Sequence, residues 1–234
     1  MIDLARIKAV GLDLDDTLWP VLPSLVRAEA AMGQWLAPRA PASAALFADT
    51  ARRLALRQGV VQRQPQLAHD MTALRLQCLR EALALHGEDP ALAEPAFAVF
   101  FEQRLQVEFY ADALPALAQL SARYPVVVVS NGNADVGRIG IGVHFHADVS
   151  AHRVGIGKPD VRIFHAAACA AGVAPHEVLH VGDDPVLDVL GARDAGMQTV
   201  WVNRAGRPWQ HAPAPDLQVH SLQELCELLG TVER

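Results

Sequence analysis

The sequence predicts an α/β protein in which a doubly wound parallel sheet is interrupted by an all-helical insert. Two patterns indicate this fold class. After residue 113, short β-branched runs alternate with helical segments, and such alternation implies right-handed crossovers between parallel strands. Between about residues 22 and 107, apolar side chains instead recur at helical spacing, and Ala, Leu, Arg, Gln and Glu dominate.

The first strand and the insert can be assigned from local patterns. Residues 7–14 form a short apolar run that ends in acids, which predicts a buried strand. In the insert, prolines stand where first helical turns would begin, at Pro41, Pro65 and Pro90. We therefore expect about four helices there and no strand.

The alternation begins with Val126–Val129, whose β-branched residues are typical of a strand covered on both faces. Further strands are expected at 145–149, 178–181 and 199–202, and helices at 114–122, 159–171, 185–195 and 222–229. A proline-rich segment at 204–216 predicts a loop. We assign residues 1–18 and 113–234 to the α/β core and residues 19–112 to a helical cap.

Composition and charge exclude several classes of protein. Hydrophobic residues make up 51% of the chain and charged residues 20%, which allows a sizeable core. A net charge of −6 argues against a nucleic-acid partner, because affinity for the phosphate backbone needs clustered Lys and Arg. Neither a membrane span nor a signal peptide is evident. Because the three cysteines show no pairing pattern, we expect a cytoplasmic protein.

Four groups of polar side chains stand where predicted strands end. In open α/β sheets, ligands bind beyond the carboxyl ends of the strands, so the groups can converge on one site. Each group alone also fits a turn or a helix cap, but two acids at the end of a buried strand are costly without a cation. The groups are Asp13 with Asp15, Ser130 with Asn131, Lys158, and Asp183 with Asp184 and Asp188.

These residue types suit the hydrolysis of a phosphate monoester. The Asp13 carboxylate can attack phosphorus to form an aspartyl phosphate, which divides one difficult step into two. Asp15 can protonate the leaving oxygen and then take a proton from the attacking water. Mg²⁺ prefers carboxylates, waters and phosphate oxygens. Asp13 and Asp183 can supply carboxylates, and Asp184 is a further candidate ligand. Lys158 can offset the negative charge that develops on the phosphoryl group.

The segments DLDDTLW, SNGNA, GKPD and HVGDDPVLDV, in this order, resemble the four motifs of the haloacid dehalogenase-like hydrolase superfamily. The helical insert resembles the C1-type cap of subfamily I. The resemblance implies a Rossmann-like core with Asp13 as nucleophile and metal ligand and Asp15 as general acid/base, whose backbone carbonyl also reaches Mg²⁺. It further implies that Ser130 and Lys158 bind phosphoryl oxygens and that Asp183 is the main metal ligand of the last motif.

Four further residues in and around these motifs have expected roles at the phosphate or the metal. Asn131 and Thr17 are expected beside Ser130 at the phosphate. The last motif has Asp184 where Ser is common, which leaves open whether Asp184 coordinates the metal directly. Asp188 is expected to contact the metal through a water molecule or to hydrogen-bond to the residues that bind it.

Three other functions compete with phosphate hydrolysis. A 2-haloacid dehalogenase needs an Asp nucleophile but no metal and no second acid, so Asp15 argues against it. A phosphonatase of this superfamily needs a cap lysine, and residues 19–112 contain none. A receiver-type phosphoacceptor module uses similar residues but has no large helical insert.

The cap is expected to set substrate specificity by covering the site. Trp19, just after the first motif, fits either the site entrance or packing. Within Gln66–Arg75 the candidates for substrate contact are His69, Asp70 and Arg75, although a solvated helix face is the alternative. The sequence resembles bacterial phosphatases acting on 5-amino-6-(5-phospho-D-ribitylamino)uracil and FMN. The expected partner is thus a small phosphorylated metabolite, bound by a monomer or homodimer; other sugar phosphates and nucleotides remain alternatives.

Overall fold

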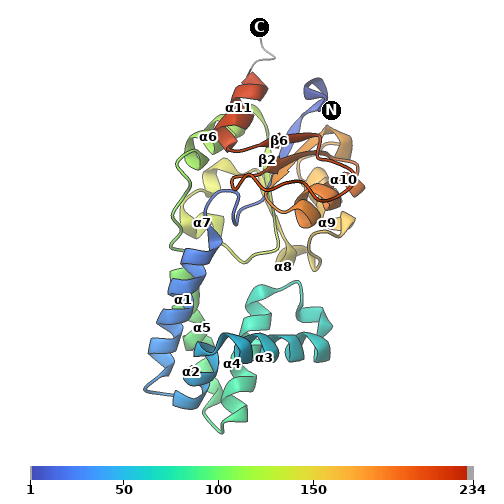
Figure 1. Cartoon of the computed structure of the whole chain (residues 1–234). Helices are drawn as coiled ribbons and strands as arrows, with labels where there is room; N and C mark the ends of the chain where they lie inside the picture. Colours follow the sequence, from blue (N-terminus) through green and yellow to red (C-terminus); the bar gives the residue numbers. More distant parts are fainter. Residues whose placement is uncertain (1, 231–234) are drawn as a thin grey trace. The chain divides into compact units, whose positions relative to one another are not determined.

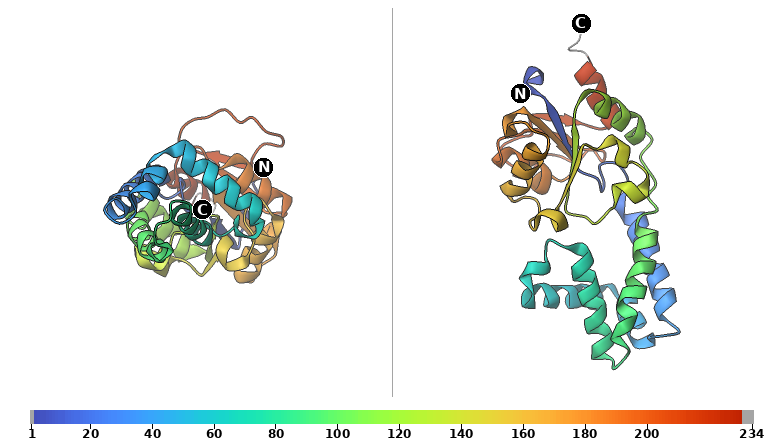
Figure 2. Two further views of the ribbon diagram at one scale, coloured as in Figure 1. Left: turned by 90° about the horizontal axis from the view of Figure 1, so that it is seen from below. Right: turned by 180° about the vertical axis from the view of Figure 1, so that it is seen from behind.

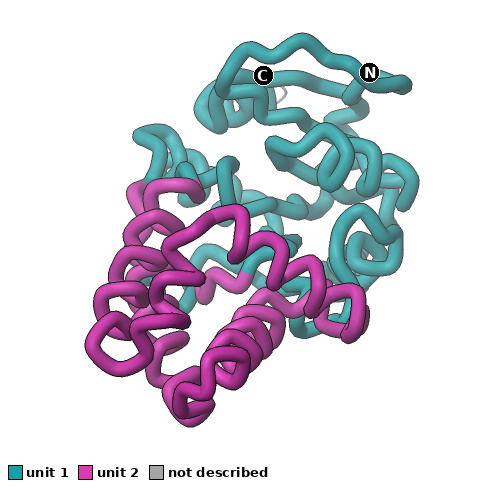
Figure 3. Tube along the Cα trace, turned by 60° about the horizontal axis from the view of Figure 1, so that its bottom comes forward, with its two compact units in different colours: residues 1–20, 109–132, 136–234 teal, residues 21–108, 133–135 magenta. Residues whose placement is uncertain are grey.

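The computed structural model describes residues 2–230, which fall into two compact units (Figures 1 and 3). The first unit extends to Pro20 and resumes at Phe109–Gly132 and from Val136 onward. The second comprises Val21–Glu108 and Asn133–Asp135. Compared with the expected cap of residues 19–112, the second unit starts two residues later and its main segment ends four residues earlier.

The first unit is built on a six-stranded parallel sheet, which confirms the predicted fold class. The strand order is β3-β2-β1-β4-β5-β6, so the direction of winding reverses beside β1. β1, β2 and β4 are buried at every position, which explains their unbroken apolar sequences. The strands are β1 (Ala9–Leu12), β2 (Val126–Ser130), β3 (Ala147–Ser150), β4 (Val178–Gly182), β5 (Gln198–Val202) and β6 (Leu217–Val219).

Helices cover both faces of this sheet (Figure 2). On one face lie α6 (Ala113–Arg123) and α11 (Leu222–Gly230), and on the other α9 (Val161–Ala170) and α10 (Gly191–Asp194). The apolar side of α9 is buried in one core cluster with Val127 and Val129 of β2. Shorter elements complete the unit: α7 (Val136–Ile139), α8 (Ala151–Val154), η1 (Leu4–Arg6), η4 (Gly142–His144) and η5 (Pro175–Glu177).

Besides the short helices α7 and α8, which the sequence did not predict, two elements of the first unit differ from expectation. β6 is a strand of three residues at the end of the predicted loop, too short for its pattern to be recognised in the sequence. The helix expected at 185–195 begins as the π-helix η6 (Pro185–Leu190) and continues as α10. Both differences concern local geometry and leave the predicted topology unchanged.

The second unit is helical, with α1 (Val21–Leu36) and α5 (Ala93–Arg104) packed side by side. It has its own core, to which Met32, Leu79 and Phe100 contribute fully buried side chains. The other helices are α2 (Pro41–Ala48), α3 (Thr50–Arg63), α4 (Met71–Leu85), η2 (Pro65–Leu67) and η3 (Pro90–Leu92). Within residues 2–230, no helix has both the length and the apolar character that crossing a membrane requires.

Candidate active site

The carboxyl ends of β1, β2 and β4 bring the predicted polar residues to one edge of the sheet. Asp13 follows β1, Ser130 is the last residue of β2, and Asp183 follows β4. Because β1 pairs in parallel with both β2 and β4, these three strand ends are neighbours. The edge lies beside the strand at which the winding reverses, where open α/β sheets bind ligands.

Lys158 joins two of the acids in a buried ion-pair cluster. Its Nζ donates to Asp13 Oδ1 and to Asp188 Oδ1, at 2.6 Å in each case. The three side chains are at most 8% exposed. Burial by itself would lower the pKa of Lys158, but the two carboxylates raise it above its usual range. The lysine is therefore charged and lies directly beside the predicted nucleophile.

Asn131 holds the backbone on which Lys158 is carried. Its Oδ1 accepts from Lys158 N at 2.7 Å, and its Nδ2 donates to Lys158 O at 2.9 Å. A Cβ on Gly157 would approach Asn131 Oδ1 to 2.7 Å, so this contact requires glycine before the lysine. Because the side-chain amide is engaged here, a contact between Asn131 and phosphate would have to come from its backbone N–H.

Asp188 is buried and held by three donors. Besides Lys158, His180 donates from Nε2 to Oδ1 at 2.9 Å, and Asp184 N donates to Oδ2 at 3.1 Å. Burial lowers the pKa of His180, so its neutral imidazole carries the proton on the nitrogen that faces the carboxylate. Burial would raise the pKa of Asp188, but Lys158 and His180 lower it to about 2.

The helix that carries Asp188 is capped by Asp184. Asp184 Oδ1 accepts from Val186 N and Leu187 N, at 2.8 Å each. This is the helix cap that the sequence left open as the alternative to a metal-binding role. Pro185 at the first helical position fits the same geometry, because it has no N–H to satisfy.

A cluster of carboxylates marks the candidate metal position. Oxygens of Asp13, Asp183 and Asp188 all lie within 4.8 Å of one another. Burial raises the pKa of Asp13 well above its usual range, even against the attraction of Lys158. Burial and neighbouring acids raise the pKa of Asp183 to about 7. One ammonium group therefore does not offset the charge of the cluster.

A hard divalent cation fits this donor set, because every ligand atom is an oxygen and carboxylates are what Mg²⁺ prefers. Asp188 already accepts hydrogen bonds on both oxygens, so Asp13 and Asp183 are the side chains better placed to hold an ion. Asp184 is not part of the cluster formed by the described residues. Its carboxylate acts at the helix cap instead.

The segment after Asp13 arranges two further predicted residues. Thr17 is fully buried, and its Oγ1 donates to Asp13 Oδ2 at 3.3 Å, a contact that orients the predicted nucleophile. The indole N–H of Trp19 donates to Asp15 Oδ1 at 2.8 Å. Trp19 is also fully buried, so its contacts match the packing alternative more closely than an exposed entrance.

The polar residues predicted to contact substrate from the cap make contacts inside the second unit. Asp70 is the N-cap of α4 and accepts from Ala73 N at 2.9 Å. Arg75 pairs with Glu29 at 2.7 Å, and its guanidinium lies 3.7 Å from the centroid of the Phe100 ring. Helix capping and an ion pair account for these two residues without a substrate. A substrate contact from His69, which is partly exposed, stays a prediction.

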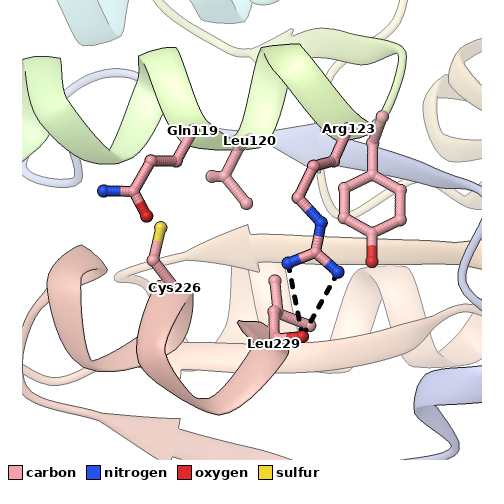
Figure 4. Close-up of a pocket in the computed structure, with 6 residues that line it drawn as sticks. Gln119, Leu120, Arg123, Cys226 and Leu229 are labelled. Carbon is pink, nitrogen blue, oxygen red and sulfur yellow. Dashed lines mark hydrogen bonds between the residues drawn. The ribbon is translucent and has the colours of Figure 1, made fainter. Parts of the chain in front are cut away.

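A small pocket between α6 and α11 contains none of the predicted site residues (Figure 4). Arg123 crosses it and donates from both terminal nitrogens to Leu229 O, at 3.3 and 3.4 Å. Cys226 Sγ also faces it, 3.8 Å from Ala116 O. The pocket is lined by Gln119, Leu120, Arg123, Tyr124, Cys226 and Leu229. It therefore offers no carboxylate or lysine for the proposed chemistry.

Comparison with known proteins assigns the family. Residues 7–196 match the family model described as haloacid dehalogenase-like hydrolase. The chain belongs to this family. This hydrolase is therefore an enzyme, and the motif resemblance that its sequence shows is confirmed over most of the chain.

Relatives of this hydrolase carry two kinds of name. The 5-amino-6-(5-phospho-D-ribitylamino)uracil phosphatase YigB of Escherichia coli is 31% identical, covering 97% of this chain and 98% of that protein. A phosphoserine phosphatase of Thermus thermophilus is 41% identical, but the match covers 64% of this chain and only 63% of that protein. A crystal structure named 2-haloacid dehalogenase, from Pseudomonas syringae, superposes with a TM-score of 0.91 at 37% identity, covering 97% of this chain and 99% of the other.

His180 is a residue whose place in the site the sequence did not reveal. It stands opposite Gly11 in the pairing of β4 with β1, and a Cβ on Gly11 would lie 2.9 Å from His180 Nδ1. A glycine inside an apolar strand often marks such a close approach. That signal was present in the sequence, but the partner of the glycine depends on strand register.

Proposed function

We propose that this hydrolase is a Mg²⁺-dependent phosphatase that cleaves a phosphate monoester through an aspartyl phosphate on Asp13. The observation that carries the proposal is the crowding of carboxylates around Asp13. Asp13 and Asp183 have raised pKa values although Lys158 lies beside them, so the cluster favours a further cation. A cation held there also favours a phosphate group, whose oxygens are ligands that Mg²⁺ prefers.

Each of the polar residues at the carboxyl ends of the strands has a separate role in the proposed reaction. A carboxylate oxygen of Asp13 bonds to phosphorus while the bond from phosphorus to the leaving oxygen breaks. Asp15 gives a proton to that oxygen, then removes one from the water that hydrolyses the aspartyl phosphate. Lys158 and Ser130 hold phosphoryl oxygens. The chemistry that Mg²⁺ supplies, when held by Asp13, Asp183 and the Asp15 carbonyl, is the offset of negative charge.

The proposed substrate is a small phosphorylated metabolite. 5-Amino-6-(5-phospho-D-ribitylamino)uracil is the first candidate, because a relative named for it matches nearly the whole chain. A glyceraldehyde 3-phosphate phosphatase of Methanopyrus kandleri, 30% identical over 95% of this chain, makes sugar phosphates the next class to test. FMN and nucleotides complete the panel. We expect activity to be highest on one member and low on p-nitrophenyl phosphate.

The nucleophile is tested by Asp13→Asn. We expect hydrolysis to fall by more than about 10³-fold, because the amide cannot form the phosphoenzyme. Release of phosphate is measured with and without Mg²⁺ after EDTA treatment, and circular dichroism checks the fold. Asp194→Asn, the same change at an exposed position on α10, should leave activity unaltered. Turnover by Asp13→Asn would contradict the assigned nucleophile, and full activity in EDTA would contradict the metal requirement.

A second candidate function is 2-haloacid dehalogenation, because of the close structural match to a protein of that name. In that reaction the Asp13 carboxylate attacks carbon instead of phosphorus. The leaving halide needs no proton, so Asp15 has no role as a general acid. Halide release from 2-chloropropionate decides between the two functions. Halide release without phosphate release from any member of the panel would replace the phosphatase proposal.

A further inference from the structure

Trp19 places a hydrogen-bond donor against the proposed general acid. Its indole N–H lies 2.8 Å from Asp15 Oδ1, within the range of a direct hydrogen bond. The whole residue is 0% exposed, so water does not compete for the N–H. A tryptophan buried for its size alone could direct its N–H at a backbone carbonyl, as Trp201 does toward Asp183 O at 2.8 Å. Trp19 directs it at a catalytic carboxylate.

The surroundings of Trp19 hold the indole in this orientation. The Phe109 ring meets it edge to face, with centroids 5.5 Å apart and an interplanar angle of 83°. On the backbone, Asp16 N donates to Trp19 O at 2.7 Å, and Tyr110 N donates to Leu18 O at 3.0 Å. Asp15 and Trp19 also form a parallel β-bridge. Donor and acceptor are thus fixed to the same short loop.

A hydrogen bond of this kind restricts the carboxyl group that accepts it. With Oδ1 tied to a rigid donor, rotation about the Cβ–Cγ bond of Asp15 is limited and the direction of Oδ2 is set. General acid catalysis depends on this direction, because the proton has to arrive at the leaving oxygen while its bond to phosphorus breaks. Filling the same volume without an N–H would remove this restraint on Oδ1 of the carboxyl group.

We infer that Trp19 is a positioning residue that orients Asp15 for proton transfer to the leaving group. The inference rests on the proposed phosphatase function and deepens it. In the step concerned, Asp13 forms its bond to phosphorus, the leaving oxygen takes the electron pair of the broken bond, and Asp15 supplies the proton that this oxygen needs. Trp19 itself transfers nothing.

A role in acid catalysis has a kinetic signature that packing lacks. Leaving groups of low basicity depart with little help, whereas strongly basic ones depend on the proton. The value of kcat/KM covers the steps up to formation of the aspartyl phosphate, so it reports on leaving-group departure. A poorly oriented Asp15 should therefore reduce kcat/KM more for phenyl phosphate than for p-nitrophenyl phosphate, two esters of similar shape.

The experiment compares wild-type protein and Trp19→Phe on a series of substituted phenyl phosphates with Mg²⁺. We expect kcat/KM to fall about 10-fold or more for phenyl phosphate and less than about 2-fold for p-nitrophenyl phosphate. The larger fall is smaller than the full contribution of a general acid, because Asp15 is still present but poorly oriented. In an Asp15→Asn background, Trp19→Phe should not change kcat/KM further for either ester. An equal fall for both esters in the folded variant, or no fall for either, would overturn the inference.

A shape-preserving variant guards against misfolding. Site-specific replacement of Trp19 by β-(3-benzothienyl)alanine exchanges the indole N–H for sulfur and retains the ring outline. This variant should show the same leaving-group dependence of kcat/KM with little change in melting temperature. An equal change in kcat/KM for both esters would again refute the role of the N–H. The same replacement at Trp35 in α1 is the matched control and should leave both esters unaffected. Failure of wild-type protein to release phosphate from these esters and from every member of the metabolite panel would contradict the proposed function instead.

Discussion

At the residue scale, neighbours decide which acids of the site are charged. Asp13 and Asp188 are both buried and share the ammonium group of Lys158. Asp188 also accepts from His180 and from a backbone N–H, and its pKa is held at about 2. Asp13 accepts a longer bond, 3.3 Å, from Thr17, and burial raises its pKa. The charge of Lys158 and the hydrogen bond from His180 keep Asp188 ionised, whereas burial and the charge of Asp188 itself raise the pKa of Asp13.

Asp183 should make the stability of metal-free protein depend on pH. Its raised pKa, about 7 against an ordinary 3.8, means that the folded state binds more protons than the unfolded state between these values. Stability therefore falls as pH rises through 7. In EDTA at pH 8, Asp183→Asn should stabilise the protein by about 1–3 kcal/mol, measured by thermal or urea unfolding.

The pH and Mg²⁺ dependence of Asp183→Asn shows whether repulsion between carboxylates causes the difference in stability. At pH 5 its advantage should shrink, because Asp183 is then largely protonated in the folded wild type. Mg²⁺ should stabilise wild-type protein at pH 8 more than it stabilises Asp183→Asn. A variant less stable than wild type in EDTA at pH 8 would show that Asp183 is not under charge repulsion.

The sequence indicated the acids and the serine by their position at strand ends. Lys158 was expected at a strand end too, but it follows α8 and reaches the site from a loop. The sequence did not indicate their partners. Asn131 was expected at the phosphate, but its side chain holds the backbone of Lys158, and Asp184 caps a helix. A polar side chain next to a site can bind a ligand or support a neighbour. Only distances distinguish these two uses.

At the scale of elements, the junction of β4 and η6 shapes the site. Gly182 ends β4, and a Cβ there would lie 2.2 Å from Asp188 Cγ. The turn thus lets the Asp188 carboxylate pack against backbone and accept from Asp184 N. Asp184 then begins the π-helix by capping two N–H groups, which keeps Asp188 facing Lys158.

Gly182→Ala should disturb this junction. Because the added methyl overlaps Asp188, we expect a loss of about 1–3 kcal/mol in the free energy of unfolding, as for overpacked cores, together with a large fall in kcat. Gly33→Ala is the matched control, since no atom lies within 4 Å of its Cβ position and it stands inside α1. It should stabilise by about 0.5–1 kcal/mol. Equal stability for wild type and Gly182→Ala would contradict the packing described.

Elements with strong patterns were predictable, and those with weak ones were not. The uninterrupted valines of β2 predict a strand covered on both faces, and the structure buries each of them. β6 is only three residues long and follows a proline-rich segment, so no hydrophobic periodicity predicts it. The π-helical start of η6 depends on a cap and on tertiary packing, which a hydrophobic pattern does not report.

At the scale of the whole molecule, each unit has a hydrophobic core of its own. The core of the second unit is built from residues of α1 to α5, and its chain ends are close in the fold because α1 lies along α5. Arg27, in the second turn of α1, donates to Glu108 Oε1 at 3.0 Å, so a polar contact also joins α1 to the segment that follows α5.

Residues 21–108 should therefore fold as an isolated fragment. We expect a helical circular dichroism spectrum and a cooperative thermal transition, because the buried cluster lies within this segment and domains of this size can fold alone. Phe100→Ala in the fragment should lower its stability by about 3–5 kcal/mol. A fragment without a cooperative transition would show that its core depends on the rest of the chain.

The sequence by itself determined the fold class, the helical character of the insert and the identity of the polar residues at the strand ends. These features follow from hydrophobic periodicity and from the order of residues along the chain, which are local properties. The tertiary structure decided that Lys158 joins Asp13 to Asp188, that His180 supports Asp188 and that Trp19 contacts Asp15. Strand register, helix caps and burial set these pairings, and they exist only once distant segments are packed together.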